Sequence, residues 1–128
     1  MEGNLLDTHT FLWYMSGDAS ISKTARQIIE GSPASNFISV ASLWEVAIKI
    51  SLGKLILHGS FNNLKELIDD NGFQILPIGF EDVLLITELP FYHRDPFDRI
   101  IIAQAINNKL MLISKDSHFA HYEINTSW

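Results

Sequence analysis

The sequence contains no cysteine, no long apolar run and no cluster of basic residues. Without cysteine the chain can form neither disulfide bonds nor zinc sites of the cysteine type. Its apolar runs stay below the ~20 residues that a membrane-spanning helix needs. The first residues, Met1–Asn4, lack the basic and apolar regions of a signal peptide. These absences predict a cytoplasmic protein with no membrane span.

Basic residues are scarce and scattered: 9 Lys and Arg stand against 15 Asp and Glu, which gives a formal net charge of −6. Proteins that bind nucleic acid usually carry a basic face, so tight nonspecific binding to a phosphate backbone is not expected from this chain alone. A protein that holds metal ions at its binding site tolerates this deficit, because the cations supply positive charge where a phosphate lies.

The 128 residues suit one compact domain, predicted over residues 1–128, and the 47% of hydrophobic residues suffice for a buried core. Short apolar runs alternate with longer segments of helical period. Strands are predicted over residues 4–6, 37–40, 73–78 and 110–113, with a small edge strand at 123–124. Helices are predicted over residues 9–15, 22–30, 42–52, 60–70, 81–89 and 96–107. This alternation indicates an α/β fold with a central parallel sheet of four to five strands and helices on both faces.

Acidic residues recur just after the predicted strands. Asp7 ends the first strand, Glu45 lies one helical turn into the helix after the second, and Asp116 closely follows the strand over 110–113. Asp95 and Asp98 open the apolar helix over 96–107, three residues apart and therefore on one helix face. Functional groups of parallel sheets gather beyond the carboxyl ends of the strands, so we expect these acids to lie together.

A cluster of carboxylates has a chemical use. Carboxylate oxygens are hard ligands that suit Mg²⁺ and Mn²⁺, and packed carboxylates take up protons unless a cation neutralises them. A cation held there polarises a phosphoryl oxygen and lowers the pKa of a bound water molecule. The pattern is therefore compatible with metal-assisted chemistry on a phosphate.

Each acid also has a purely structural interpretation. The segments Ser42–Glu45 and Asp95–Asp98 fit the capping box of a helix N-terminus, and Asp7 and Asp116 are placed to cap the segments that follow them. Capping explains any one acid well, but it does not explain why acids recur at strand ends. Both interpretations stay open on the pattern alone.

Other conspicuous residues are predicted to be structural. The five histidines form no zinc signature of the HExxH kind. Four aromatic residues are assigned to the core rather than to base stacking: Trp13, Trp44, Phe97 and Phe119. Arg94 and Arg99 are expected to contact phosphate or to pair with nearby carboxylates.

Four blocks of the sequence resemble one known family. They are Asn4–Trp13, Ser42–Lys49 with Gly53–Leu55, His93–Ala105, and Ser114–Asp116 with Phe119. Taken in order, these blocks resemble PIN domains, especially the VapC-like ribonuclease toxins of bacterial type II toxin–antitoxin systems. They cover nearly the whole chain, and the third block is the most specific of the four.

The resemblance implies a single PIN-like domain of doubly wound α/β fold and an endoribonuclease that depends on Mg²⁺ or Mn²⁺. Asp7 and Asp98 would be the principal metal ligands. Glu45 would complete the site by binding the metal or orienting water. Asp116 would ligate a second metal, or the first through water. These four acids are the predicted catalytic and metal-binding residues.

The resemblance implies supporting roles for three further residues. Thr8 and Ser114 would hydrogen-bond the ligands, and Asp95, which belongs to this subgroup, would act as a cap or support the site. The implied partners are an RNA substrate, a cognate antitoxin protein that covers the site, and a second copy of the chain in a homodimer.

Two other functions stay open at this stage. A non-catalytic RNA- or protein-binding module on the same fold would account for the weak basic character and for acids that only cap helices. A phosphatase of the strand-end aspartate kind would need a second acid two residues after Asp7, where this chain has His9. The phosphatase is therefore the least favoured.

Overall fold

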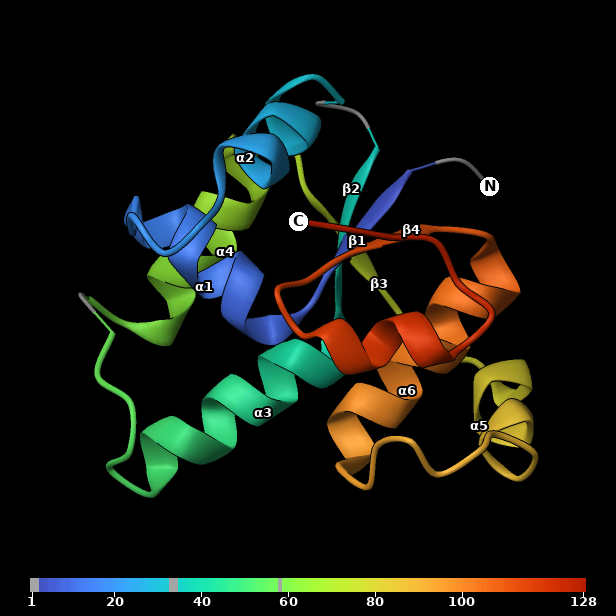
Figure 1. Cartoon of the computed structure of the whole chain (residues 1–128). Helices are drawn as coiled ribbons and strands as arrows, with labels where there is room; N and C mark the ends of the chain where they lie inside the picture. The colour runs from blue at the N-terminus through green and yellow to red at the C-terminus, as the bar shows by residue number, and fades with distance from the viewer. Residues whose placement is uncertain (1–2, 33–34, 58) are drawn as a thin grey trace.

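One sheet of five parallel strands organises the chain in the computed structural model, which describes residues 3–32, 35–57 and 59–128 (Figure 1). The strand order is β3-β2-β1-β4-β5. The strands are β1 (Asn4–Leu6), β2 (Asn36–Ser39), β3 (Gln74–Leu76), β4 (Met111–Ile113) and β5 (Thr126–Ser127). The predicted α/β class with a parallel sheet is confirmed.

Six α-helices and one short 3-10 helix surround the sheet in the described part of the chain. They are α1 (Thr8–Ser16), α2 (Lys23–Glu30), α3 (Val40–Ser51), α4 (Phe61–Asp70), α5 (Phe80–Ile86), α6 (Pro96–Asn108) and η1 (Ser117–His121). The ambiguous segment after Asp95 is helical, as predicted, with Pro96 in its first turn. Among the described residues no helix is both long and apolar enough to span a membrane.

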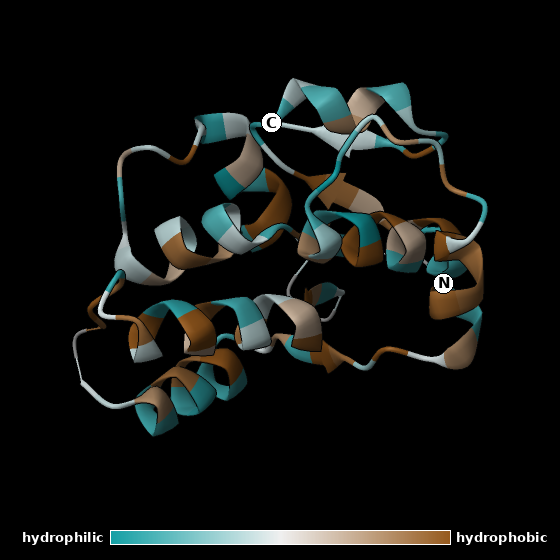
Figure 2. Ribbon diagram, turned by 90° about the horizontal axis from the view of Figure 1, so that it is seen from below, coloured by the Kyte–Doolittle hydropathy of each residue, from teal (hydrophilic) through white to brown (hydrophobic). Residues whose placement is uncertain are grey.

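The three inner strands, β2, β1 and β4, are buried on both faces, which explains the apolar residues that follow one another along them. Successive residues point to opposite sides. Leu5 therefore joins the core cluster beneath α6, whereas Leu6 joins the cluster that contains Phe11 of α1 and Ala25 of α2. Figure 2 shows the apolar colour on the central strands and in bands along the helices around them. The core is thus two apolar layers, one on each side of the sheet.

The order of the strands creates one switch point. From β1 the chain moves outward to β2 and β3, then returns to place β4 on the other side of β1. Leu6 of β1 is in register with Ile113 of β4, so Asp7 and Ser114 leave the sheet side by side. In open parallel sheets this place, beyond the carboxyl ends of the strands, is where binding sites form.

Several predicted boundaries differ from the observed ones. The helix α3 begins at Val40, two residues before the predicted start, because the Ser39 hydroxyl accepts a hydrogen bond from the Ala41 N–H at 3.0 Å. The edge strand lies at Thr126–Ser127 rather than at 123–124, and it pairs with β4. The helix α5 ends at Ile86, three residues early.

Arg99 explains the early end of α5. Its side chain on α6 is buried, 5% exposed, and its guanidinium packs 4.1 Å from the centre of the Phe91 ring. The guanidinium donates hydrogen bonds of 2.9–3.3 Å to four carbonyl oxygens, those of Ile86, Leu89, Pro90 and His93. The chain after Ile86 therefore wraps around Arg99 instead of continuing the helix. Both roles expected for Arg99 were wrong: it is too buried for phosphate, and it pairs with no carboxylate in the described part of the chain.

Candidate metal centre

Asp7 both caps a helix and faces the site. Its Oδ1 accepts a hydrogen bond from the Thr10 N–H at 2.9 Å, which caps α1. Its Oδ2 accepts a hydrogen bond from the Ser114 hydroxyl at the end of β4. Asp7 is buried, so the carboxylate is held rigidly by these two donors. Capping and a place in the acid cluster are therefore compatible for this residue.

Glu45 does not form the expected capping box. The cap of α3 is Ser39, so Glu45 lies in the second turn and its carboxylate is released from the helix end. The Thr8 hydroxyl donates to Glu45 Oε1 at 2.8 Å, and Lys49 Nζ lies 3.2 Å from Oε2. Thr8 Oγ1 also lies 2.9 Å from Ser42 Oγ. The capping interpretation is thus wrong at Glu45, which favours a functional role for its carboxylate.

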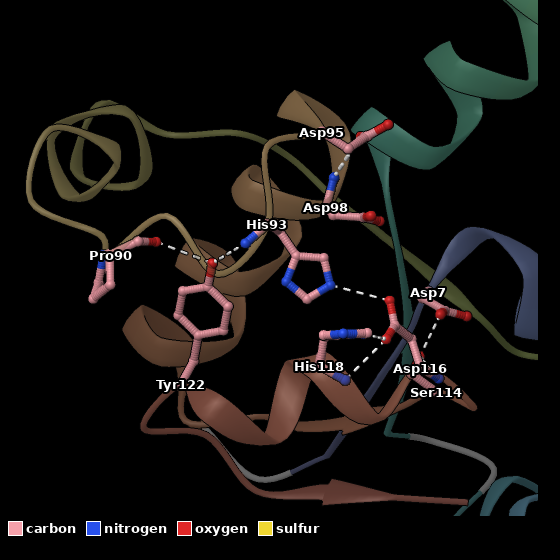
Figure 3. A network of polar contacts seen from close by, with 9 residues as sticks. All are labelled: Asp7, Pro90, His93, Asp95, Asp98, Ser114, Asp116, His118 and Tyr122. Carbon is pink, nitrogen blue, oxygen red and sulfur yellow. Dashed lines mark hydrogen bonds and ion pairs between the residues drawn. The ribbon is translucent and has the colours of Figure 1, made fainter.

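The first turn of α6 brings in two more acids (Figure 3). Asp95 Oδ1 accepts hydrogen bonds from the Phe97 and Asp98 N–H groups at 2.8 and 3.1 Å, so Asp95 is the cap. Asp98 points into the cluster. Burial, followed by repulsion from Asp95, Asp7, Glu45 and Asp116, raises the pKa of Asp98 to about 7. All four of the other predicted acids therefore lie close enough to Asp98 to raise its pKa, so the five acids form one cluster.

Asp116 adds the fifth acid, from the connection between β4 and η1. Its Oδ1 accepts a hydrogen bond from the His118 N–H at 2.9 Å and lies 3.0 Å from His118 Nδ1, while Oδ2 lies 3.0 Å from His93 Nε2. Burial alone would raise the pKa of Asp116, but the hydrogen bonds from His93 and His118 together lower it below its usual value. Its side chain is 38% exposed and stays ionised at neutral pH.

His93 was predicted to be more a structural than a site residue, but the structure places it in the site beside Asp116. It is 9% exposed and its ring stacks on Phe119 at 4.5 Å, while its backbone N–H donates to the Tyr122 hydroxyl at 2.8 Å. The Tyr122 hydroxyl donates in turn to the Pro90 carbonyl. A loop residue follows no periodic pattern, so hydropathy says nothing about the role of His93. Its only signal in the sequence is its place two residues before Asp95.

His93 is oriented as a donor to Asp116. Its Nδ1 is buried without a hydrogen-bond partner among the described residues, so a proton on Nδ1 would be costly. The proton therefore belongs on Nε2, where it is donated to Asp116. A metal-binding imidazole normally donates its other N–H to an acceptor, and no such acceptor faces His93 Nδ1 in the described structure. The geometry makes His93 a positioning residue.

The cluster has the donors that a divalent cation requires. Carboxylate oxygens of Asp98 and Asp116 lie within 4.8 Å of each other, and the carboxylates of Asp7 and Glu45 are close enough to raise the pKa of Asp98. A partly buried carboxylate whose pKa is raised by four neighbouring acids marks a place with an excess of negative charge, which a bound cation would relieve. Hard oxygen donors suit Mg²⁺ and Mn²⁺.

The aromatic assignments were only partly right. Phe119 is buried as predicted, but Trp44 is 61% exposed and meets Phe97 edge-on at 5.1 Å between ring centres. Trp44 precedes Glu45 on α3, and Phe97 precedes Asp98 on α6. Trp44 therefore lies on the surface beside the acid cluster rather than in the core.

The chain belongs to the PIN domain family. The sequence model of the PIN domain matches residues 5–125. No curated protein matches the chain in sequence.

Several solved structures have the same fold. A toxin–antitoxin complex from Klebsiella pneumoniae contains a chain that is 21% identical, with 98% of this chain and 97% of that one covered and a TM-score of 0.68. DNA-bound VapBC from Salmonella typhimurium gives 16% identity, 99% and 98% coverage and a TM-score of 0.69. VapBC2 from Rickettsia felis, bound to a fragment of promoter DNA, gives 15% identity, 99% coverage of this chain and 98% of that one, and a TM-score of 0.71. At these identities the likeness shows the fold.

Proposed function

We propose that this protein is a Mg²⁺- or Mn²⁺-dependent endoribonuclease and the toxin of a bacterial toxin–antitoxin pair, acting as one domain over residues 1–128. The observation that carries the proposal is the convergence of five acids at the switch point of the sheet, with Asp98 raised to a pKa of about 7. Membership of the PIN domain family and the structural likeness to VapBC chains support it.

The residues divide the work according to their surroundings. Asp7, which is buried, and Asp98, whose pKa is raised, serve as the principal metal ligands, while Glu45 and Asp116 complete the site. A bound divalent cation supplies the polarisation of a phosphoryl oxygen and an acidified water molecule. The Ser114 and Thr8 hydroxyls hold Asp7 and Glu45 in place, and Asp95 holds the first turn of α6.

The proposed partners are a cognate antitoxin and, in a homodimer, a second copy of the chain. Exposed large apolar side chains support such contacts, since several are more than half exposed, among them Trp44, Leu52, Phe91 and Tyr92. The structural neighbours, which come from toxin–antitoxin complexes, support the antitoxin.

The first prediction tests the activity itself. Purified protein without its partner is expected to cut total RNA with Mg²⁺ or Mn²⁺ and not with chelator. Asp7→Asn is expected to abolish cutting, because the amide cannot replace an anionic ligand, while asparagine still caps α1 and preserves the fold. Gel analysis of RNA fragments and circular dichroism of both proteins provide the measurement.

Cleavage that survives both chelation and Asp7→Asn would disprove the metal-dependent mechanism. A folded protein that cuts no RNA and shows no saturable Mg²⁺ binding by calorimetry would instead indicate the non-catalytic binding module.

A second prediction concerns His93. His93→Phe keeps an aromatic ring against Phe119 but removes the donor to Asp116, so Mg²⁺ affinity and cleavage are each expected to fall by about 10- to 100-fold. His93→Gln retains an N–H donor and is expected to recover part of the loss. Calorimetric titration of Mg²⁺ separates this effect from a general loss of structure. Equal Mg²⁺ affinity in the wild type and His93→Phe would contradict the positioning role.

A further inference from the structure

A cavity of about 300 Å³ opens directly from the acid cluster. It is lined by Asp7, His9, Trp13, Lys115 and Asp116. Two of these five residues are carboxylates of the candidate metal centre, so whatever occupies the cavity lies next to a group held at that centre. The other three belong to α1 and to the connection after β4. None of the three has a part in the proposed chemistry.

Two of the residues that line this cavity, His9 and Trp13, are aromatic. His9 and Trp13 are four residues apart and therefore share one face of α1, with 5.8 Å between their ring centres. Trp13 also meets Trp128 near the C-terminus at 5.8 Å. His9 is exposed and Trp13 is partly buried, with one side packed against the core beneath α1. A rigid ring that is anchored on one side and lines a cavity on the other is a stacking surface.

The negative charge of the chain makes a stacking surface useful for binding a nucleic acid. A net charge of −6 leaves little electrostatic attraction for a polyanion, and Lys115 is the single cation among the residues that line the cavity. Proteins bind single-stranded nucleic acid by combining backbone contacts with base stacking on aromatic rings, and each stacked base contributes about 1–3 kcal/mol. Stacking therefore supplies affinity that the charge of this protein cannot.

We propose that the cavity between α1 and the β4–η1 connection binds one nucleobase of a single-stranded RNA substrate, adjacent to the phosphodiester that is cut. This inference rests on the proposed ribonuclease function and adds a subsite to it. His9 and Trp13 contact the base, and Lys115 contacts the neighbouring phosphate. The base fixes which phosphodiester reaches the carboxylates, because Asp7 and Asp116 form the wall on that side.

Nucleoside binding tests the subsite without any cleavage. The chain has three tryptophans, so a ¹⁵N-labelled sample gives three indole N–H signals, which Trp13→Phe, Trp44→Phe and Trp128→Phe assign. Titration with each of the four ribonucleosides, in chelator, is expected to shift the Trp13 signal in a saturable way. Ribose alone, which lacks the base, is expected to leave it unchanged. A shift confined to Trp44, or no shift at Trp13 with any nucleoside, would overturn the proposal.

Kinetics provide the second test. Trp13→Leu is expected to raise KM for a single-stranded RNA oligonucleotide by about 5- to 160-fold with little change in kcat, because stacking stabilises the bound substrate and the transition state alike. His9→Ala, on an exposed residue that cannot unfold the core, is expected to raise KM in the same direction by less. Phe80→Ala removes an exposed aromatic ring of α5 outside the cavity and is the matched control.

The outcomes separate the subsite from the proposed function. RNA cleavage by the wild type with unchanged KM in both cavity variants would overturn the base subsite and leave the ribonuclease standing. Absence of cleavage by the wild type would instead refute the ribonuclease, whereas nucleoside shifts at Trp13 would still report the subsite.

Discussion

Asp98→Asn is expected to abolish metal-dependent cleavage and, at the same time, to stabilise the metal-free protein. The carboxylate of Asp98 is partly buried and lies near four other acids, which raises its pKa to about 7. Above that pH the folded protein has to keep an anion where burial and repulsion disfavour it. Asparagine has nearly the same shape and no charge, so it removes the repulsion together with the metal ligand.

The direction of the pH dependence follows from the two states of Asp98. Unfolding returns its pKa to about 3.8, so between pH 4 and pH 7 the folded state binds more protons than the unfolded state. The free energy of unfolding of the metal-free protein therefore falls as the pH rises through this range. Partial exposure to solvent reduces the effect, and we expect Asp98→Asn to gain about 1–2 kcal/mol at pH 8 and almost nothing at pH 4.

Thermal unfolding in chelator at pH 4 and pH 8 measures this difference, which corresponds to roughly 3–8 °C in Tm at the higher pH. Adding Mg²⁺ at pH 8 is expected to raise the Tm of the wild type and to leave the variant nearly unchanged, since only a state that binds the ion is stabilised by it. Asp70→Asn, on an exposed acid of α4, is the control and should follow the wild type. A destabilised metal-free variant at pH 8 would contradict the account.

The acid cluster could be predicted because its position depends on topology alone. Parallel strands whose carboxyl ends share one edge bring Asp7, Glu45 and Asp116 together whatever the details of packing. The alternation of apolar runs and helical segments was enough to reveal that topology. Asp95 and Asp98 joined the cluster by the same argument, because Asp95-Pro96 marks the start of a helix.

The features that escaped prediction depend on side-chain contacts across the fold. His93 lies in a loop, and its direction toward Asp116 comes from Phe119 and Tyr122 of a distant segment. The surface position of Trp44 depends on where α3 begins, which the Ser39 cap decides. Hydropathy and spacing carry no information about such contacts, so an apolar residue was assigned to the core by default.

Arg99 is the clearest case, and the second large effect is expected there. Arg99→Met retains the apolar stem but leaves the carbonyls of the α5–α6 connection without their donor. Hydrogen bonds from a charged donor contribute about 1.5–3 kcal/mol each and do not add fully, so we expect the free energy of unfolding to fall by about 3–5 kcal/mol. Urea unfolding followed by circular dichroism measures the loss.

The α5–α6 connection also contains His93 and Asp95, so Arg99 helps to fix the position of these two residues beside the acid cluster. Arg99→Lys tests whether charge alone is sufficient: one ammonium group cannot donate to four carbonyls on two sides as a planar guanidinium does, and we expect it to recover less than half of the loss. Arg94→Met removes an exposed neighbouring charge and should change stability by no more than about 0.5 kcal/mol. Equal stability of Arg99→Met and Arg94→Met would show that the connection holds its shape without the guanidinium, and the positions of His93 and Asp95 would then have to come from their own contacts with Tyr122 and α6.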